Sequence, residues 1–432
     1  MERERWRHHL DYLTSLLGYS MGSGSLVKFP YLCMRNGGGA FLLPYIFFTF
    51  VGAIPCVFLE MVVGQFSQSG SINVWNMCPP FKGIGVGVAL VTWMYLICYL
   101  PVFAWFMYYF YHSFLDKLPW DNCDQPWNTP ACVADLGIRT HNNTVANVTH
   151  LPPNAVINVT PGDSFTAPGM TAAEEFWRLQ VLQMTDGLEH IGGIRWPLVG
   201  CMAVTCVVMF LFAFKGIKVS GKVVYITVGV PLMLILVFLV QGCLLPGSAD
   251  GIYYYVYPKF EKLRAQSITN DRPRTGRAQV TAAAQDRDAI LSGIVDMFGL
   301  ILTGFAFFAI MGHVAYQLGV PVEAFESSGF SLAFIVYPQV VTHLPLPHVW
   351  SVLTFLALMT LEIDSLLPGL EIMLGAIEDA YSGIGKRRSI VLFVILLGGI
   401  YIVTLVDWYN YFPAIGVFAM LECFVVSWCY VL

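Results

Sequence analysis

Nine long apolar stretches recur along this chain of 432 residues, and they restrict its possible folds more than any other feature. Each is long enough to cross the hydrocarbon core of a bilayer, which is about 30 Å thick. Charged residues make up only 12% of the chain, whereas soluble domains carry roughly 25%. The pattern predicts an all-α polytopic membrane protein, and the small net charge of -5 gives no indication of a nucleic-acid partner. The stretches lie at 12–34, 41–65, 84–114, 196–214, 223–245, 289–312, 348–375, 389–406 and 408–431.

The first stretch, 12–34, is interrupted by the small residues Gly22–Ser25. Glycine is unfavourable inside a helix, and serine competes for backbone hydrogen bonds there. Within a bilayer, unwound backbone is tolerated only where it is buried in protein or lines a cavity. Two interpretations of the break stay open: a flexible kink without a ligand, or a site whose freed amides and carbonyls hold a solute and ions.

Basic residues predict the orientation of the helices, because cytoplasmic loops are enriched in lysine and arginine. Arg3, Arg5 and Arg7 place the N-terminus in the cytoplasm. Basic clusters within 215–222 and 386–388 place two later turns on the same side. The long loop between the third and fourth stretches is then extracellular.

Two features of that loop, 115–195, agree with an extracellular position. Cys123 and Cys132 lie nine residues apart in a polar setting, which predicts a disulfide. The loop also carries three sequons for N-glycosylation, at Asn142, Asn147 and Asn158. We therefore expect a large glycosylated loop on a multi-pass protein of the plasma membrane.

The polar segment 264–288 disagrees with the count of crossings. The basic clusters require one more crossing between the fifth and sixth apolar stretches, yet this segment carries arginines and aspartates such as Arg272 and Asp271. Each such residue at the bilayer centre costs about 2.5–3.5 kcal/mol. Either a helix is missing here or the later helices are reversed against the charge rule, and we favour a missing helix. The loop 316–347 is expected to form short helices that cap the outer face, rather than a tenth span.

Several motifs follow one another in a specific order along nearly the whole chain. They are Lys28–Cys33, Asn36–Tyr45, Phe58–Phe66, Lys215–Tyr225, Asp286–Ala289, Tyr337–Pro338 and Ile363–Ser365. With them the sequence resembles the neurotransmitter:sodium symporters, the sodium- and chloride-coupled transporters with the LeuT fold. The resemblance implies one transmembrane transporter domain over 1–432, built as an inverted-repeat helix bundle. It also implies that 264–288 replaces the sixth helix of the family and that the last two helices are lacking.

The resemblance implies two sites for Na⁺. One site would use the carbonyls of Gly18 and Met21 together with Leu361, Asp364 and Ser365, of which the last two supply the side-chain ligands of the metal. An ionisable side chain within an apolar stretch, such as Asp364, indicates a functional position by default. The alternative is an aspartate that is paired with a hydroxyl or a helix N-terminus.

The second sodium site departs from the family pattern. By resemblance it would use Ser20, Ser25, Asp296 and a residue of the missing helix, and both Ser25 and Asp296 stand where the family has asparagine. This site is therefore either rebalanced or lost. The alternative for Asp296 is a residue near the cytoplasmic start of a helix.

The resemblance assigns the substrate to the same break. Tyr99 matches the tyrosine that binds the substrate carboxylate, and the amides of Ser23 and Gly24 would face that group. Gly22 stands where amine transporters have aspartate, which leaves room for a carboxylate on the substrate. We therefore expect a small zwitterionic, amino-acid-like substrate rather than a monoamine. Tyr95 either lines the pocket or packs in the core.

The resemblance also implies a chloride site and two gates. Tyr45 matches the chloride tyrosine, but Leu300 stands where the family has serine and cannot donate to an anion, which argues against chloride dependence. The outer gate would pair Lys28 with Asp407. The residues of the inner gate would be Arg3, Trp6 and Asp379. An acid at position 362, between two predicted sodium residues, stands where the family has a small residue.

The sequence thus predicts a sodium-coupled secondary active symporter that moves a small amino acid or neurotransmitter by alternating access. The alternative is a transport-incompetent variant, either a splice form or an incomplete gene model, or a regulatory partner of a full-length family member. An enzyme is not expected, since no nucleotide-binding loop or nucleophile–base pair stands out. Besides substrate and lipid, the expected partners are a second copy of the chain or a full-length sibling.

Overall fold

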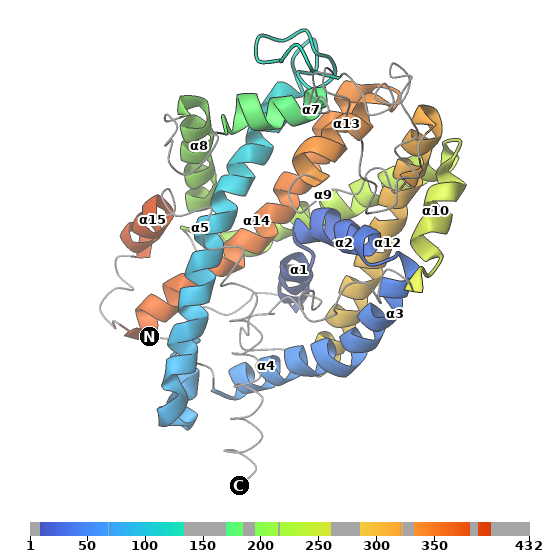
Figure 1. The fold of residues 1–432 in the computed structure, drawn as a ribbon. Coiled ribbons are helices and arrows are strands. Elements are labelled where there is room, and N and C mark those ends of the chain that lie inside the picture. The colour runs from blue at the N-terminus through green and yellow to red at the C-terminus, as the bar shows by residue number, and fades with distance from the viewer. Residues whose placement is uncertain are drawn as a thin grey trace, which may run out of the picture.

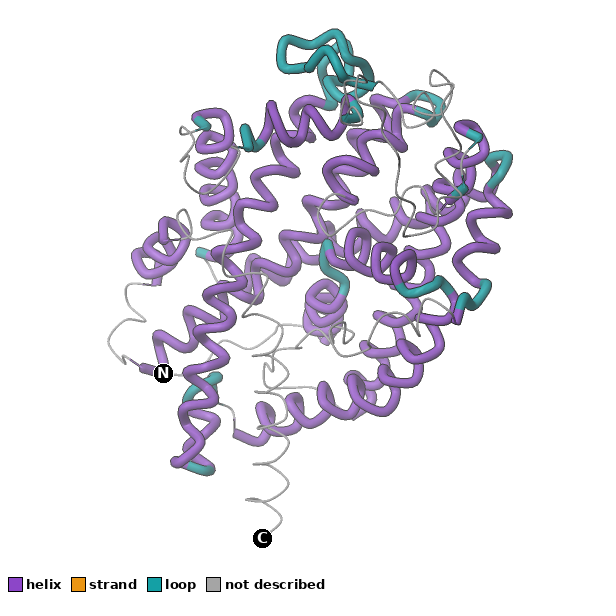
Figure 2. Tube along the Cα trace, viewed as in Figure 1, coloured by secondary structure: helices purple, strands orange, loops and turns teal. Residues whose placement is uncertain are grey.

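The protein is all-α, as its sequence predicts. The computed structural model describes residues 9–67, 69–133, 170–184, 195–214, 217–260, 286–319, 321–322, 332–380 and 388–398. Within these ranges the regular elements are helices (Figures 1 and 2), and β-structure is limited to two isolated bridges, Gly38 with Pro258 and Val133 with Thr171. The fold is that of a polytopic membrane protein.

Six described helical segments are long and apolar enough to cross a bilayer. They coincide with six of the nine predicted stretches, whereas the ninth stretch, 408–431, lies outside the described residues. The eighth stretch is described only as far as Gly398, where α15 (Arg388–Gly398) ends. The count of nine spans is therefore not confirmed. The six segments are Gly39–Gly64, Pro79–His112, Trp196–Ala213, Lys222–Leu244, Ile290–Leu318 and Pro347–Ala380.

These segments belong to a small number of long helices. The first combines α3 (Gly39–Phe48), the π-turn η1 (Thr49–Ala53) and α4 (Ile54–Ser67). The others are α5 (Lys82–His112), α8 (Trp196–Ala213), α9 (Ile217–Leu244), α12 (Asp286–Leu318) and α14 (Pro347–Ala380). Short 3₁₀ turns, η2 (Asn73–Met77) and η3 (Pro79–Phe81), precede α5.

The first predicted stretch forms two short helices instead of one. α1 (His9–Ser20) and α2 (Gly24–Arg35) are separated by an irregular segment, 21–23. Each half has 12 residues and is thus about 18 Å long, too short to cross a bilayer alone. The predicted break is confirmed, although its bounds differ from the predicted Gly22–Ser25. It begins one residue earlier, at Met21, because α1 ends at Ser20, and it ends at Ser23, because Gly24 already starts α2.

The broken helix lies inside the bundle. α1 packs against α9, α12 and α14, and α2 packs against α12. α14 also packs against α5 and α9, so it runs through the middle of the structure beside α1 (Figure 1). Unwound backbone is therefore surrounded by protein, which is the condition under which a membrane protein tolerates it.

The glycines after α2 allow a close approach to α10 (Ser248–Val256). Gly37 and Gly38 have φ values of +84° and +61°, a region that side chains other than glycine rarely adopt. A Cβ at Gly39 would collide with the carbonyl of Val256. Lys259 N donates to Gly37 O at 3.1 Å across the same contact. The Asn-Gly-Gly-Gly motif is thus explained by backbone packing.

Short helices cover the ends of α2, α5 and α14. They are α7 (Ala172–Glu175) and η5 (Phe176–Val181), followed later in the chain by η7 (Leu332–Val336) and α13 (Tyr337–Thr342). Trp177 stacks on Phe334 with ring centroids 4.2 Å apart. The described part of 316–347 beyond α12 thus contains short helices, as expected; its extracellular position stays a prediction.

The predicted disulfide between Cys123 and Cys132 is present. Glu175 of α7, which is 0% exposed, fastens the loop that this disulfide closes. Its carboxylate accepts from Asn128 Nδ2 at 3.0 Å, from Thr129 N at 2.9 Å and from the Thr129 hydroxyl. The predicted glycosylation sites Asn142, Asn147 and Asn158 lie outside the described residues, as does the segment 264–288 before α12 begins.

Candidate functional site

Gly18 and Asp364 face one another across the interface between α1 and α14. A Cβ on Gly18 would stand 3.2 Å from Asp364 Oδ2 and 2.7 Å from Val228 Cγ2 of α9. The second distance is shorter than real carbon contacts, so any larger residue at position 18 would force Val228 to shift. Three helices therefore meet at this point, and the carboxylate of Asp364 lies against the end of the first half-helix.

Asp364 is only 2% exposed, and its two carboxylate oxygens differ. Oδ1 accepts a hydrogen bond from the hydroxyl of Thr227 on α9. Oδ2 is buried and has no hydrogen-bond partner among the described residues. A buried polar atom without a partner costs free energy, and a charged one costs more. The Oδ2 atom that faces Gly18 is therefore a fitting ligand for a small cation.

Gly22 and Ser365 form a second contact between the break and α14. A Cβ on Gly22 would collide with Ser365 Oγ, so the backbone of the break passes directly over this hydroxyl. Ser365 Oγ donates to Leu361 O at 3.3 Å within α14. The side chain of Met21 lies instead against Gly299 of α12, where a Cβ would stand 2.7 Å from Met21 Cε. The structure thus brings the residues of the first predicted sodium site to the two sides of the break; their role as ligands stays a prediction.

The second predicted sodium site is only partly described. Asp296 lies on α12 and is half-buried, and its carboxylate is close enough to Tyr45 to act on it electrostatically. The backbones of Ser20 and Ser25 belong to α1 and α2, but their side chains lie outside the described part of the chain. Contacts of these two side chains with Asp296 therefore lie outside the described part of the chain as well.

Lys28 and Tyr99 are bonded to one another. Lys28 Nζ donates to the Tyr99 hydroxyl at 2.6 Å and lies 5.2 Å from the centre of its ring. The predicted outer-gate lysine thus contacts the predicted substrate tyrosine, while Asp407 lies outside the described residues. Tyr95 stacks on Tyr99 at 4.3 Å and packs against the apolar cluster shared by α5, α8 and α14. Core packing is therefore part of the role of Tyr95.

Ser23 and Gly24 start the second half-helix. Ser23 is the N-cap residue of α2, but its side chain makes no capping hydrogen bond. A Cβ on Gly24 would meet nothing within 4 Å. The first amides of a helix have no acceptor within the helix, so this end of α2 combines backbone donors with open space.

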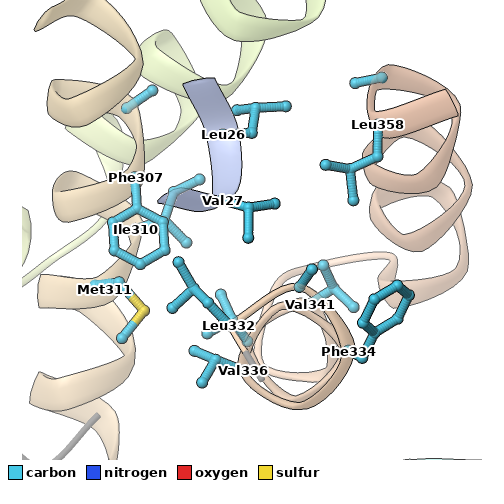
Figure 3. Close-up of a cluster of buried hydrophobic side chains, with 14 of the residues drawn as sticks. Leu26, Val27, Phe307, Ile310, Met311, Leu332, Phe334, Val336, Val341 and Leu358 are labelled. Carbon is cyan, nitrogen blue, oxygen red and sulfur yellow. The ribbon is translucent and has the colours of Figure 1, made fainter. Parts of the chain in front are cut away.

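The side of α2 beyond Gly24 is covered by the short helices η7 and α13. Leu26 and Val27 pack against Phe307 of α12, Leu358 of α14 and the cap helices η7 and α13 (Figure 3). Tyr337 of α13 donates its hydroxyl hydrogen to Leu26 O at 2.6 Å. The outer half of the broken helix is thus held by apolar packing and by one direct hydrogen bond.

The remaining predicted residues are only partly described. Tyr45 packs edge-on against Phe29 at 5.2 Å, and Leu300 lies against the main apolar cluster. Asp379 accepts a hydrogen bond from Asn73 N at 3.3 Å. Its predicted inner-gate partners, Arg3 and Trp6, lie outside the described residues.

Three residues to which the sequence assigned no role at the site complete this region, although Tyr337 belongs to one of the motifs. Thr227 binds Asp364, Tyr337 binds the backbone of α2, and Val228 fixes the need for glycine at 18. A hydroxyl inside the apolar stretch 223–245 is a weak signal for Thr227, because threonines in helices commonly bond their own backbone.

A half-helix that ends at a buried carboxylate inside a membrane bundle defines a class: multi-pass membrane proteins that hold ions or solutes at a broken helix. Comparison with known proteins specifies the class further. The sequence model of the sodium:neurotransmitter symporter family matches residues 3–273 and 279–432. The chain belongs to this family, as the resemblance of its motifs indicated.

Individual proteins that are similar to this chain are transporters of the same kind. The sodium- and chloride-dependent taurine transporter of Rattus norvegicus is 34% identical over 464 residues, which cover 99% of this chain and 72% of the relative. The sodium- and chloride-dependent creatine transporter 1 of Bos taurus is 36% identical over 463 residues, with 99% and 70% covered. The human creatine transporter 1 is 35% identical over 459 residues. These relatives are transporters, not enzymes.

The names of these relatives speak against one expectation. Both kinds of relative are called chloride-dependent, whereas the leucine at 300 argued against chloride dependence. A leucine side chain cannot bind an anion through a hydrogen bond, but the other groups around Tyr45 are not fixed by that single position. The expected loss of chloride dependence is therefore not supported.

Proposed function

We propose that this protein is a sodium-coupled symporter of a small amino-acid-like solute. The observation that carries the proposal is Asp364 Oδ2, a buried carboxylate oxygen that has no hydrogen-bond partner in the described part of the chain and faces Gly18, near the end of α1. A cation at this oxygen would touch both α1 and α14. Membership of the family supports sodium as that cation.

The sodium ion would be held by oxygen atoms from both sides of the break. In this proposal the carbonyls of Gly18, Met21 and Leu361 and the side chains of Asp364 and Ser365 are its ligands. Thr227 orients the carboxylate from α9 through the bond to Oδ1. Since α1 ends at this point, occupancy by sodium would stabilise one arrangement of the half-helix against α14. Such a differential effect is what coupling requires.

The substrate would lie beside the same break. Its anionic group would face Tyr99 and Lys28, together with the first amides of α2. Taurine and creatine, which name the relatives, are both small zwitterions and suit such a site. Because the names of the relatives include chloride, we carry chloride as a co-ion of the proposed transport, with Tyr45 as a candidate ligand. Alternating access at the plasma membrane, with the N-terminus in the cytoplasm, completes the proposal.

Uptake measurements test this function. Cells that express the chain should accumulate labelled taurine, creatine, glycine, GABA or proline when the medium contains sodium, but not when choline replaces it. Asp364→Asn should abolish the sodium-dependent part, since a neutral amide compensates a cation poorly. The absence of sodium-dependent uptake for every one of these solutes, in cells that display the protein at the surface, would disprove the proposal.

A second candidate function is that of a partner without transport activity. The observation that favours it is the interruption of the family match at 274–278, inside the polar segment 264–288. The resemblance places the sixth helix of the family there. Reading the genomic locus tests this candidate: an apolar exon between the codons for Leu263 and Ala284 would show a variant form. Co-precipitation with a full-length family member would then support a regulatory role.

A further inference from the structure

Glu362 is a buried carboxylate that the proposed sodium site does not use. It lies in the middle of α14, between the predicted sodium residues Leu361 and Asp364, and is 0% exposed. Neither of its carboxylate oxygens has a hydrogen-bond partner among the described residues. An ionisable side chain at such a position is costly, and in membrane proteins it indicates a functional site.

The second half-helix presents two polar groups to this carboxylate. They are the hydroxyl of Ser23 and the ammonium of Lys28, both of which interact with Glu362. Lys28 Nζ donates to the Tyr99 hydroxyl at 2.6 Å, so its charge is held on the side of α5. Ser23 makes no capping bond with its own helix. The oxygens of Glu362 are therefore close to α2, but neither of them lies within hydrogen-bond geometry of a described donor.

There is open space at the same end of α2. A Cβ on Gly24, the residue after Ser23, would have no atom within 4 Å. The carboxylate of Glu362 interacts with Ser23, and Gly24 with its open face is the next residue, so both belong to the N-terminal end of the half-helix. A helix N-terminus alone would attract anions, but here the chain itself places a carboxylate beside it.

The charges of the named groups indicate what a ligand must carry. In their ionised forms Asp364 and Glu362 would contribute two negative charges, and Lys28 would contribute one positive charge. One sodium ion at Asp364 makes this set neutral, so a ligand without net charge adds no uncompensated charge. Carboxylate oxygens accept hydrogen bonds only, and an ammonium offers three donors while a guanidinium offers a planar pair.

We infer that Glu362, together with the Ser23 hydroxyl, binds the cationic group of a zwitterionic substrate, which is an ammonium or a guanidinium. The anionic group of the same substrate faces Lys28 and Tyr99. This inference rests on the proposed function and names a residue of that site that determines specificity. It explains why a charged side chain is tolerated at position 362, since the transported ligand supplies the missing donors.

The test compares ligands that differ only in the cationic group. The full chain is purified in detergent with sodium, and dissociation constants are obtained from ligand-induced shifts of its melting temperature. Three pairs are used, in which a hydroxyl replaces the ammonium: taurine and isethionate, glycine and glycolate, GABA and 4-hydroxybutyrate. Wild-type protein is expected to bind the zwitterion of its best pair at least about tenfold more tightly, because a hydrogen bond between charged groups is lost with the hydroxyl.

Glu362→Gln should reduce this preference to within about twofold, since the amide keeps the shape and loses the charge. Glu362→Asp keeps the charge and should retain part of the preference. Glu371→Gln, which removes another carboxylate from the same helix, is the matched control and should keep the wild-type ratio. Elution as a single monodisperse species shows that each variant is folded. If Glu362→Gln does not elute as a single species, the ratio of dissociation constants within the best ligand pair is measured in Glu362→Asp and Ser23→Ala instead. A ratio below that of the wild-type protein in these variants supports the inference, and an unchanged ratio overturns it.

An unchanged ratio in Glu362→Gln overturns the inference and leaves the proposed function intact. The inference is also overturned if Glu362→Gln changes only the sodium requirement, because Glu362 would then serve the ion and not the substrate. If wild-type protein binds none of the six ligands in sodium, the proposed function itself fails for this class of solute, and the inference fails with it.

Discussion

Lys28 donates a hydrogen bond to the hydroxyl of Tyr99 at 2.6 Å, and this bond joins the second half of the broken helix to α5. The two residues are 71 positions apart in the sequence. The ammonium also lies 5.2 Å from the centre of the tyrosine ring, within the range of a cation–π interaction. In this arrangement the tyrosine presents the oxygen of its hydroxyl to the lysine. An anionic substrate group would thus meet both side chains at once.

Removal of this hydroxyl should weaken substrate binding. We expect Tyr99→Phe to raise KM for the best zwitterionic substrate by about tenfold or more, because a hydrogen bond to a charged group contributes about 1.5–3 kcal/mol. Tyr95→Phe is the matched control, since Tyr95 stacks on the same ring at 4.3 Å and removal of its hydroxyl leaves the bond between Lys28 and Tyr99 in place. Sodium-dependent uptake measures both variants. Equal changes in KM would show that ring packing, and not the hydroxyl, determines binding.

The contact between Gly18 and α9 predicts a second effect. In Gly18→Ala the new Cβ would stand 2.7 Å from Val228 Cγ2 and 3.1 Å from Asp364 Cγ. Such overpacking costs about 1–3 kcal/mol, and it moves the carboxylate away from the break. We expect a lower melting temperature and a sodium concentration for half-maximal uptake that is raised several-fold.

The neighbouring Gly229 provides the control for this substitution. It lies on α9 next to Val228, and a Cβ there would meet nothing within 4 Å. Alanine is favoured over glycine in a helix by about 1 kcal/mol, so Gly229→Ala should keep or raise the melting temperature. If both variants behave alike, the close approach of α1 to Asp364 is not what restricts position 18.

Thr227 is expected to orient the carboxylate of Asp364. Thr227→Val keeps the size of the side chain but leaves Oδ1 without the donor that the structure shows. We expect the sodium concentration for half-maximal uptake to rise about tenfold, in line with the loss of one hydrogen bond to a charged group. Thr205→Val is the control, because Thr205 is also buried and donates to Cys201 O of its own helix. An unchanged sodium requirement in Thr227→Val would contradict the assignment.

The sequence was sufficient for the features that one segment determines by its own chemistry. Small residues predict a break near Gly22, and an acid in an apolar stretch singles out Asp364. Both signals are local, because the cost of unwound backbone or of a buried charge in lipid applies wherever the segment lies. The structure confirms the break and places Asp364 beside it.

The partners of these residues could not be predicted, because packing decides them. Thr227 resembles any threonine that bonds its own helix, and it also does so, to Val223 O at 3.3 Å. Tyr337 bonds the backbone of Leu26 across 311 positions, which no periodicity of either segment indicates. The resemblance predicts different roles for Tyr99 and Lys28, whereas the structure joins them in one contact.

The disulfide-bonded loop after α5 allows a prediction that does not depend on transport. Glu175 is 0% exposed and accepts three hydrogen bonds from Asn128 and Thr129, within the loop that the disulfide Cys123–Cys132 closes. Glu175→Ala removes the acceptor of these three hydrogen bonds, and a hydrogen bond to a charged group contributes about 1.5–3 kcal/mol. We expect a large fall in the melting temperature of the purified protein and reduced display at the cell surface.

Glu174→Ala is the adjacent control, because Glu174 forms a partly exposed pair with Arg178 at 3.0 Å, one helical turn away. Such pairs contribute about 0.3–0.5 kcal/mol, so the melting temperature of this variant should hardly change. A similar fall in both variants would show that the loop is not fastened through Glu175.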